Sequence, residues 1–322
     1  MADYLVNGAM MVNEITFCDG KRLSGVIGGG AVYAAAGAGL WSDSVILAAG
    51  CGEDGDCFFS QWMDRYGLVR DGIRVKGKRT NHFFLRYHED GSYEEGLLGQ
   101  GETDWSQIDF MTLSPEEMEP YYKNLRGMYN IMDIDRDYWE RMGRYKEIYG
   151  FPIMWEVATA TADREHLEDF YRILPMVDFY SLNLKEAISL FGIQEEEKLI
   201  AHMAGLGVPV YFRVGVRGAY VIDQNRQVFA PSYITPGEVD PTGCGNASTA
   251  AAMTGLVEKR SFEEVGAMAA VAASYNARQY GPMAFMNQER RSEAEKLVNM
   301  ILKNPNKNDS IKGGSDNDKY KR

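Results

Sequence analysis

Short apolar runs recur along the chain, and turn residues or amphipathic segments separate them. The runs at residues 4–6, 44–49 and 153–157 have the length and composition of buried strands. Further strands are predicted at residues 130–134, 178–182, 208–214 and 219–222. Helical segments alternate with them, at residues 57–66, 138–149, 164–174, 247–257 and 262–279. Strand and helix in alternation predict an α/β fold with a doubly wound, mostly parallel sheet.

Two segments interrupt this alternation, at residues 10–26 and 76–101. Each is rich in β-formers and carries a turn signal, Asp19-Gly20 in the first and Asp90-Gly91 in the second. We therefore expect one α/β domain over residues 1–302 with two β segments set apart from its main sheet. The polar residues 303–322 are predicted to be a disordered tail.

Glycine turns precede two of the predicted helices near the N-terminus. Gly28-Gly29-Gly30 leads into an alanine-rich helix, and a second glycine-rich loop occupies residues 50–56. In an open parallel sheet, ligands bind at the carboxyl ends of the strands, so both loops are candidate ligand contacts.

The most informative stretch is DPTGCGN, from Asp240 to Asn246, directly before the alanine-rich residues 247–257. Gly243 and Gly245 allow the amides of residues 243–246 to turn toward one point ahead of the helix. Together with the positive end of the helix dipole, such a turn suits an anion. An alternative is an ordinary helix start with Asn246 as its N-cap.

This stretch resembles the second signature of the ribokinase family, also called the PfkB carbohydrate-kinase family. The pair of glycine-rich loops, at residues 28–30 and 50–56, resembles its first signature, and the two β segments resemble its small β lid. The resemblance implies a ribokinase-like, three-layer fold over nearly the whole chain. It also implies an anion hole at Gly243, Cys244 and Gly245.

The resemblance assigns two further groups of residues. It implies that the substrate is bound by Asn13, Glu14, Gly29 and Gly30. It also implies ATP and Mg²⁺ as cofactors. The residues that would bind them are Asn183, Glu186, Gly215, Gly218, Asp240 and Asn276, with Glu186 holding the metal through water. From the residues alone, Asn183 and Glu186 are equally well explained as an N-cap and an acidic first turn.

Two positions depart from the family pattern. The position of the family's general base, an Asp, is Asn246 here, and an amide cannot accept a proton at useful pH. The family's sugar-gripping Asp is also not clearly in place in the segment Met11-Val12-Asn13-Glu14. The first function hypothesis is a kinase for a sugar, sugar derivative or nucleoside, in which Asp240 or water takes the proton. The second is a pseudokinase that binds nucleotide or sugar without turnover.

Composition excludes several other classes. The formal charge of -12 argues against a nucleic-acid footprint, and no apolar window is long enough for a membrane span. The four cysteines and four histidines show no metal-ligand spacing. We expect a cytoplasmic enzyme with a small-molecule substrate, and the resemblance implies a homodimer formed through the lid.

Overall fold

The computed structural model describes residues 3–89, 93–98, 110–234, 237–283 and 286–303. Within these residues the centre is a nine-stranded sheet of order β13-β12-β11-β10-β9-β8-β1-β4-β5. The strands are β1 (Tyr4–Asn7), β4 (Val45–Gly52), β5 (Ile73–Gly77), β8 (Gly127–Met132), β9 (Ile153–Val157), β10 (Phe179–Asn183), β11 (Val210–Arg213), β12 (Gly218–Ile222) and β13 (Gln227–Pro231). All pairs from β5 to β11 are parallel, and β12 and β13 continue the sheet antiparallel. The predicted mostly parallel sheet is confirmed.

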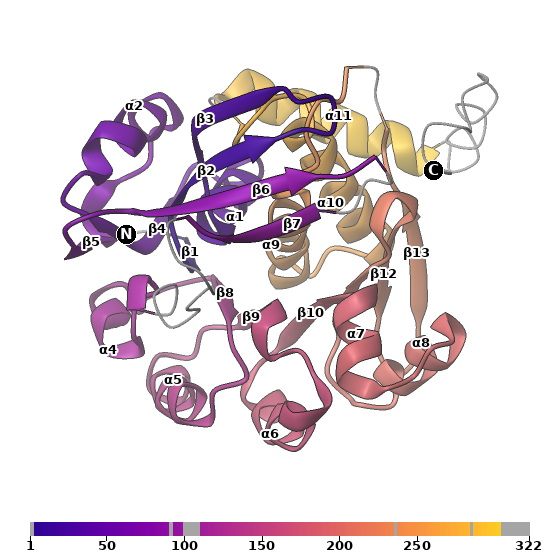
Figure 1. Cartoon of the computed structure of the whole chain (residues 1–322). Helices are drawn as coiled ribbons and strands as arrows, with labels where there is room; N and C mark the ends of the chain where they lie inside the picture. Colours follow the sequence, from indigo (N-terminus) through magenta and orange to yellow (C-terminus); the bar gives the residue numbers. More distant parts are fainter. Residues whose placement is uncertain (1–2, 90–92, 99–109, 235–236, 284–285, 304–322) are drawn as a thin grey trace.

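Helices cover both faces of this sheet, which gives three layers (Figure 1). One apolar core packs beneath α1 (Gly30–Gly39), α2 (Gly55–Tyr66), α9 (Cys244–Val257), α10 (Phe262–Asn276) and α11 (Gln288–Lys303). The other core packs beneath α4 (Pro115–Met118), α5 (Arg136–Tyr149), α6 (Leu167–Ile173), α7 (Leu184–Phe191) and α8 (Glu196–Ala204). The fold therefore has the three-layer arrangement that the sequence predicts.

The small residues of α1 and α9 allow these two helices to approach closely. A Cβ atom on Gly37 of α1 would lie 2.1 Å from the backbone oxygen of Ala247 in α9. This distance is far below van der Waals contact, so only glycine fits. The contact fixes the N-terminal turn of α9 against α1, and with it the glycine turn that precedes α9.

A separate four-stranded sheet forms the lid, in the order β3-β2-β6-β7. Its strands are β2 (Met11–Thr16), β3 (Arg22–Gly28), β6 (Asn81–Tyr87) and β7 (Tyr93–Leu97). They share a small apolar core that includes Ile15, Phe83, Leu85 and Leu97. Both predicted β segments thus meet in one sheet, while β5 at the start of the second segment joins the large sheet. Pairing of two lids in a dimer stays a prediction.

Several boundaries differ from those that the sequence predicts. The helix before residue 257 begins at Cys244, three residues early, because Gly243 at φ 75° is its N-cap. The segment from residue 164 opens as a 3₁₀ turn, since Asp163 caps it, and α6 starts only at Leu167. Helices α8 and α11 were not predicted.

In the described ranges, no helix has the length and apolar character of a membrane span. Residues 90 and 91 of the predicted turn, and 304–322 of the predicted tail, lie outside those ranges.

Candidate active site

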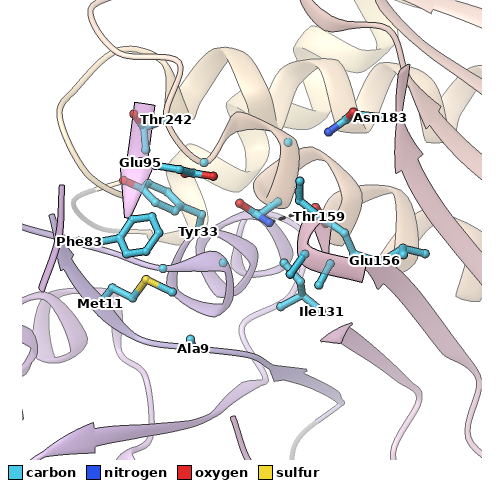
Figure 2. Close-up of a pocket in the computed structure, with 18 of the residues that line it drawn as sticks. Ala9, Met11, Tyr33, Phe83, Glu95, Ile131, Glu156, Thr159, Asn183 and Thr242 are labelled. Atoms are coloured by element: carbon cyan, nitrogen blue, oxygen red, sulfur yellow. Dashed lines mark hydrogen bonds between the residues drawn. The ribbon is translucent and has the colours of Figure 1, made fainter. Parts of the chain in front are cut away.

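A cavity of about 410 Å³ lies where the lid, the start of α9 and the carboxyl ends of the central strands meet. Strands β10 and β11 contribute their last residues, Asn183 and Arg213, and β9 contributes Glu156 and Val157. In Figure 2, Tyr33 and Glu95 lie on one side of the cavity, with Glu156 and Thr159 on the other. The cavity has the place that ligand sites take in open parallel sheets.

The glycine turn before α9 forms one wall of the cavity. A Cβ atom on Gly243 would lie 2.0 Å from the ring of Tyr33, and one on Gly245 would lie 2.3 Å from Arg213 Nη1. Gly243, whose φ is 75°, therefore requires glycine, whereas a side chain at residue 245 would displace the Arg213 guanidinium. Between them, burial raises the pKa of the Cys244 thiol to about 11, so this side chain stays neutral near pH 7. Only its backbone can face an anion.

Two buried side chains hold this turn from behind. Asp240 is 2% exposed, and its Oδ1 accepts hydrogen bonds from Thr242 N at 2.9 Å and from Thr242 Oγ1 at 2.6 Å. Asn276 donates from Nδ2 to the Thr242 oxygen at 2.8 Å. The lid joins the same point, because the Tyr87 hydroxyl lies 2.5 Å from Thr242 Oγ1. Thr242 thereby couples the lid to the turn.

Asn246 lies in the first turn of α9, so it is not the N-cap that the alternative interpretation assigns to it. Its Nδ2 donates to Glu156 Oε1 at 3.1 Å and faces the Tyr129 hydroxyl at 3.3 Å. With both donor contacts directed into the protein, the Oδ1 atom is left as an acceptor on a side chain that lines the cavity.

Arg213 lies between two buried carboxylates. Its Nη1 is 2.9 Å from Glu156 Oε1, and its Nη2 is 3.5 Å from Glu186 Oε2, with Glu156 and Glu186 only 4% and 5% exposed. The Tyr129 hydroxyl adds a 2.7 Å hydrogen bond to Glu156 Oε2. One guanidinium therefore serves two carboxylates beside the glycine turn, so the two buried carboxylates share a single counter-charge.

Asn183 and Glu186 form a reciprocal cap at the start of α7. Asn183 Oδ1 accepts from the Glu186 amide at 2.9 Å, and the Asn183 amide donates to Glu186 Oε2 at 2.7 Å. Thr159 Oγ1 donates to Glu186 Oε1 at 2.8 Å. Burial raises the pKa of Glu186 against the opposing effect of Arg213. Capping, which the residues alone allow, is thus observed, and both residues also line the cavity.

Across the cavity from these groups, the substrate-side candidates separate into two sets. Asn13, Gly29 and Gly30 line the cavity. Glu14 does not, because successive side chains of a strand face opposite ways, and its Oε1 accepts from the Gly25 amide instead. Of the two polar side chains expected from β2, only Asn13 reaches the cavity.

The remaining sequence candidates lie outside the cavity lining: Cys244, Gly215, Gly218, Asp240 and Asn276. Gly218 is instead required by packing, since a Cβ atom there would lie 2.1 Å from the Ala230 oxygen. The second glycine loop also contributes nothing to the lining. Asp54 in that loop accepts hydrogen bonds from the Thr80 amide and hydroxyl, which anchors the start of α2. Residues 50–56 therefore lie outside this cavity lining, and their contact with a ligand stays a prediction.

Sequence reasoning missed several polar residues at or beside the cavity, among them Glu95, Tyr129, Glu156 and Arg213. Glu156 and Arg213 could have been noticed as charged residues at the ends of apolar strand runs. Tyr129 and Glu95 give no such signal in the sequence.

A search against protein-family models matches residues 129–289 to the pfkB family of carbohydrate kinases. The chain belongs to this family. A cytidine kinase from Thermococcus kodakarensis is 25% identical over 280 residues, covering 82% of this chain and 92% of the relative.

Two solved structures show the same fold. Adenosine kinase from Sinorhizobium meliloti superposes with a TM-score of 0.71 at 16% identity, over 92% of this chain and 99% of that one. Arabidopsis thaliana ribokinase, complexed with ribose and ATP, gives a TM-score of 0.65 at 20% identity, over 92% and 99%. These relatives are kinases, and nothing in the comparisons supports the pseudokinase hypothesis.

Proposed function

We propose that this chain transfers the γ-phosphoryl group of ATP to a hydroxyl of a sugar or nucleoside. The observation that carries the proposal is the cavity itself. It brings the glycine turn of α9 and Asn246 together with the lid and with the substrate-side residues Asn13, Gly29 and Gly30. A family of carbohydrate kinases and relatives that act on nucleosides or ribose support the same reaction class.

The chain's own groups can stabilise the charge of the transferring phosphoryl group. The amides at the start of α9 and the helix dipole favour an anion at the turn. Arg213 adds a fixed positive charge beside Gly245. Because phosphoryl transfer passes through a loose transition state, positioning and electrostatics of this kind supply most of the catalysis.

Asn246 orients the acceptor. Since its Nδ2 is occupied by Glu156 and Tyr129, its Oδ1 is the atom that accepts a hydrogen bond from the substrate hydroxyl. The hydroxyl oxygen is then directed at the phosphorus. Asp240 is not the proton acceptor in this scheme, because its Oδ1 is bonded within the turn and the residue lies outside the cavity lining.

Magnesium enters with ATP, as part of that substrate. The residues present fit a metal held through water better than a direct ligand set, because both Glu186 oxygens already accept hydrogen bonds. Asn183 and Glu186 would orient that water. The ion would supply further neutralisation of the phosphate charge.

Apart from Asn13, Tyr87 and Glu95, the lid side of the cavity is apolar. Met11, Phe83 and Leu85 line it, together with Tyr33 from α1. Such a wall suits the flat face of a nucleobase or the apolar face of a sugar, while Asn13 offers hydrogen bonds to hydroxyls. Closure of the lid over this wall would exclude water, so that ATP is not hydrolysed.

ADP formation tests the proposal. The unmodified chain with Mg²⁺ and ATP is assayed over a panel of pentoses, hexoses, amino-sugar derivatives and nucleosides. We expect ADP to form with at least one acceptor, in an amount proportional to the acceptor that is consumed. Substrate-independent ADP release, or none with any acceptor, would reject the kinase function. Ligand-induced thermal stabilisation without turnover would instead indicate a binding protein.

A further inference from the structure

Two adjacent glutamates on β7 of the lid face opposite ways. Glu94 points outward, where its Oε2 lies 3.1 Å from Arg86 Nη1 and its Oε1 lies 3.4 Å from His88 Nε2. Glu95 points inward and lines the cavity. In Figure 2 its carboxylate extends from the lid strand past Tyr33 toward the middle of the cavity. The alternation follows from the two-residue period of a strand.

The register of the lid fixes where Glu95 lies. Glu95 pairs with Leu85 of β6, two residues from Tyr87, and Tyr87 contacts Thr242 at the glycine turn. Phe83, Leu85 and Tyr87 line the same cavity. The inward face of β6 and β7 is therefore held against the turn, with Glu95 at the point where lid and turn enclose the cavity.

Glu95 also differs from the other lining carboxylates in its hydrogen-bond partners. Glu156 accepts hydrogen bonds from Arg213, Asn246 and Tyr129, and Glu186 accepts from Asn183, Thr159 and Arg213. These bonds occupy lone pairs of both carboxylates. The third lining carboxylate, Asp133, accepts a hydrogen bond from Thr161.

Among the described residues, Glu95 has neither a hydrogen-bond donor nor a basic side chain as its partner. Its side chain is exposed within the open cavity, where a bound substrate can reach it. Partial desolvation there, and to a smaller extent the negative charge of Glu186, raise the pKa of the Glu95 carboxyl. A carboxylate whose pKa moves toward neutrality is a better base at the working pH than an ordinary one.

We propose that Glu95, carried by the lid, is the catalytic base that Asn246 cannot be. This inference rests on the proposed kinase function. As the substrate hydroxyl oxygen forms its bond to the γ-phosphorus, the bond from phosphorus to the β,γ-bridging oxygen breaks and ADP leaves. The hydroxyl proton passes to a Glu95 oxygen. Opening of the lid then returns the proton to solvent, and chemistry becomes dependent on lid closure.

The test compares Glu95→Gln with Glu94→Gln in the full chain, using the best acceptor from the ADP assay. Glu94→Gln is the matched control, because it removes the same charge from the same strand on the outward face. We expect Glu95→Gln to lower kcat by about 10²- to 10⁴-fold, the usual cost of losing a general base, with KM changed by less than about threefold. Glu94→Gln should keep the unmodified rate.

The pH dependence of kcat separates a base from a merely structural residue. The unmodified chain should gain rate as pH rises through the raised pKa of Glu95, and Glu95→Gln should lose that limb. Glu95→Asp, which keeps the carboxylate on a shorter arm, should retain the limb at a reduced rate.

Three outcomes would overturn the inference. An unchanged kcat in Glu95→Gln would reject the base while leaving the kinase function intact. A raised KM with kcat preserved would make Glu95 a substrate-binding residue instead. Absence of turnover in the unmodified chain would reject the kinase function, and this inference with it. Equal thermal midpoints of the two glutamine variants would verify that neither result comes from unfolding.

Discussion

Asn246 Nδ2 donates a 3.1 Å hydrogen bond to Glu156 Oε1, and this contact explains why residue 246 is an amide. An Asp at the same place would put two carboxylates in contact beside a single guanidinium that already serves Glu186. The departure at position 246 is thus matched by the neighbouring Glu156. The two residues are best regarded as one unit.

Replacing Asn246 with Asp, without a change at Glu156, should therefore not raise the activity of the chain. In Asn246→Asp, we expect a loss of about 1–3 kcal/mol in the free energy of unfolding, because the amide donor is replaced by a like charge. The loss should grow as pH rises above about 4, since an acid whose folded pKa is raised costs stability only where it would otherwise ionise. Urea unfolding between pH 5 and 8 measures this effect.

The double variant Asn246→Asp with Glu156→Gln is the matched control, because it exchanges acid and amide across the same hydrogen bond. It should recover most of the lost stability. If Asn246→Asp alone were as stable as the unmodified chain across that pH range, the proposed coupling between the two positions would be wrong.

Among the residues that the structure describes, Arg213 is the cation paired with both buried carboxylates, so its removal should have a large effect. For Arg213→Met we expect a loss of about 3–5 kcal/mol, because Glu156 and Glu186 would remain buried without their counter-charge. Adding Glu156→Gln to this variant should reduce the loss. Thermal or urea unfolding gives the comparison, and a loss below about 1 kcal/mol would contradict the pairing.

Arg213→Lys separates stability from chemistry. Lysine keeps the charge but cannot present two donors in a fixed plane to the two carboxylates. We expect a smaller loss of stability than in Arg213→Met and a fall in kcat of at least about tenfold, equal to about 1.4 kcal/mol of transition-state binding. A variant with unchanged kcat would show that Arg213 only holds the carboxylates.

The sequence predicted the strands well because each buried strand is a continuous apolar run, as residues 153–157 illustrate by matching β9. It predicted the glycine turn because the backbone at Gly243, with φ 75°, selects glycine. Helix α8 escaped prediction because its nine residues, a charged start followed by a mostly apolar stretch, are too few to show a helical period. The local sequence pattern is sufficient to predict an element where burial or backbone geometry alone determines the residue type.

The residues of the site can be predicted from the sequence only where a single helix, strand or turn contributes them. Asn246, Glu156 and Arg213 come from α9, β9 and β11, and nothing in the sequence shows that they meet. Likewise, Asp240 and Asn276 have residue types that suit a nucleotide contact, yet tertiary packing uses both to hold the turn. Such assignments depend on contacts between distant segments.

The glycine turn makes a further prediction at Gly245. In Gly245→Ala, the added methyl group would lie 2.3 Å from Arg213 Nη1, so either the turn or the guanidinium must move. Overpacking of this kind costs about 1–3 kcal/mol. We expect at least about tenfold weaker ATP binding by calorimetry. Gly143→Ala in α5, where the nearest atom lies 3.8 Å away, is the control and should keep the affinity; equal affinities in both variants would exclude an anion site at the turn.

Thiol reactivity tests the packing around the turn without any substrate. Cys18 and Cys57 are exposed, whereas Cys51 is buried and the Cys244 thiol has a pKa of about 11. Because only the thiolate reacts, about one Cys244 in a thousand is reactive at pH 8. We expect iodoacetamide to modify Cys18 and Cys57 first, as read by peptide mass spectrometry. Rapid modification of Cys244 in the folded chain would show that the turn is open to solvent and that Asn276 does not hold it closed.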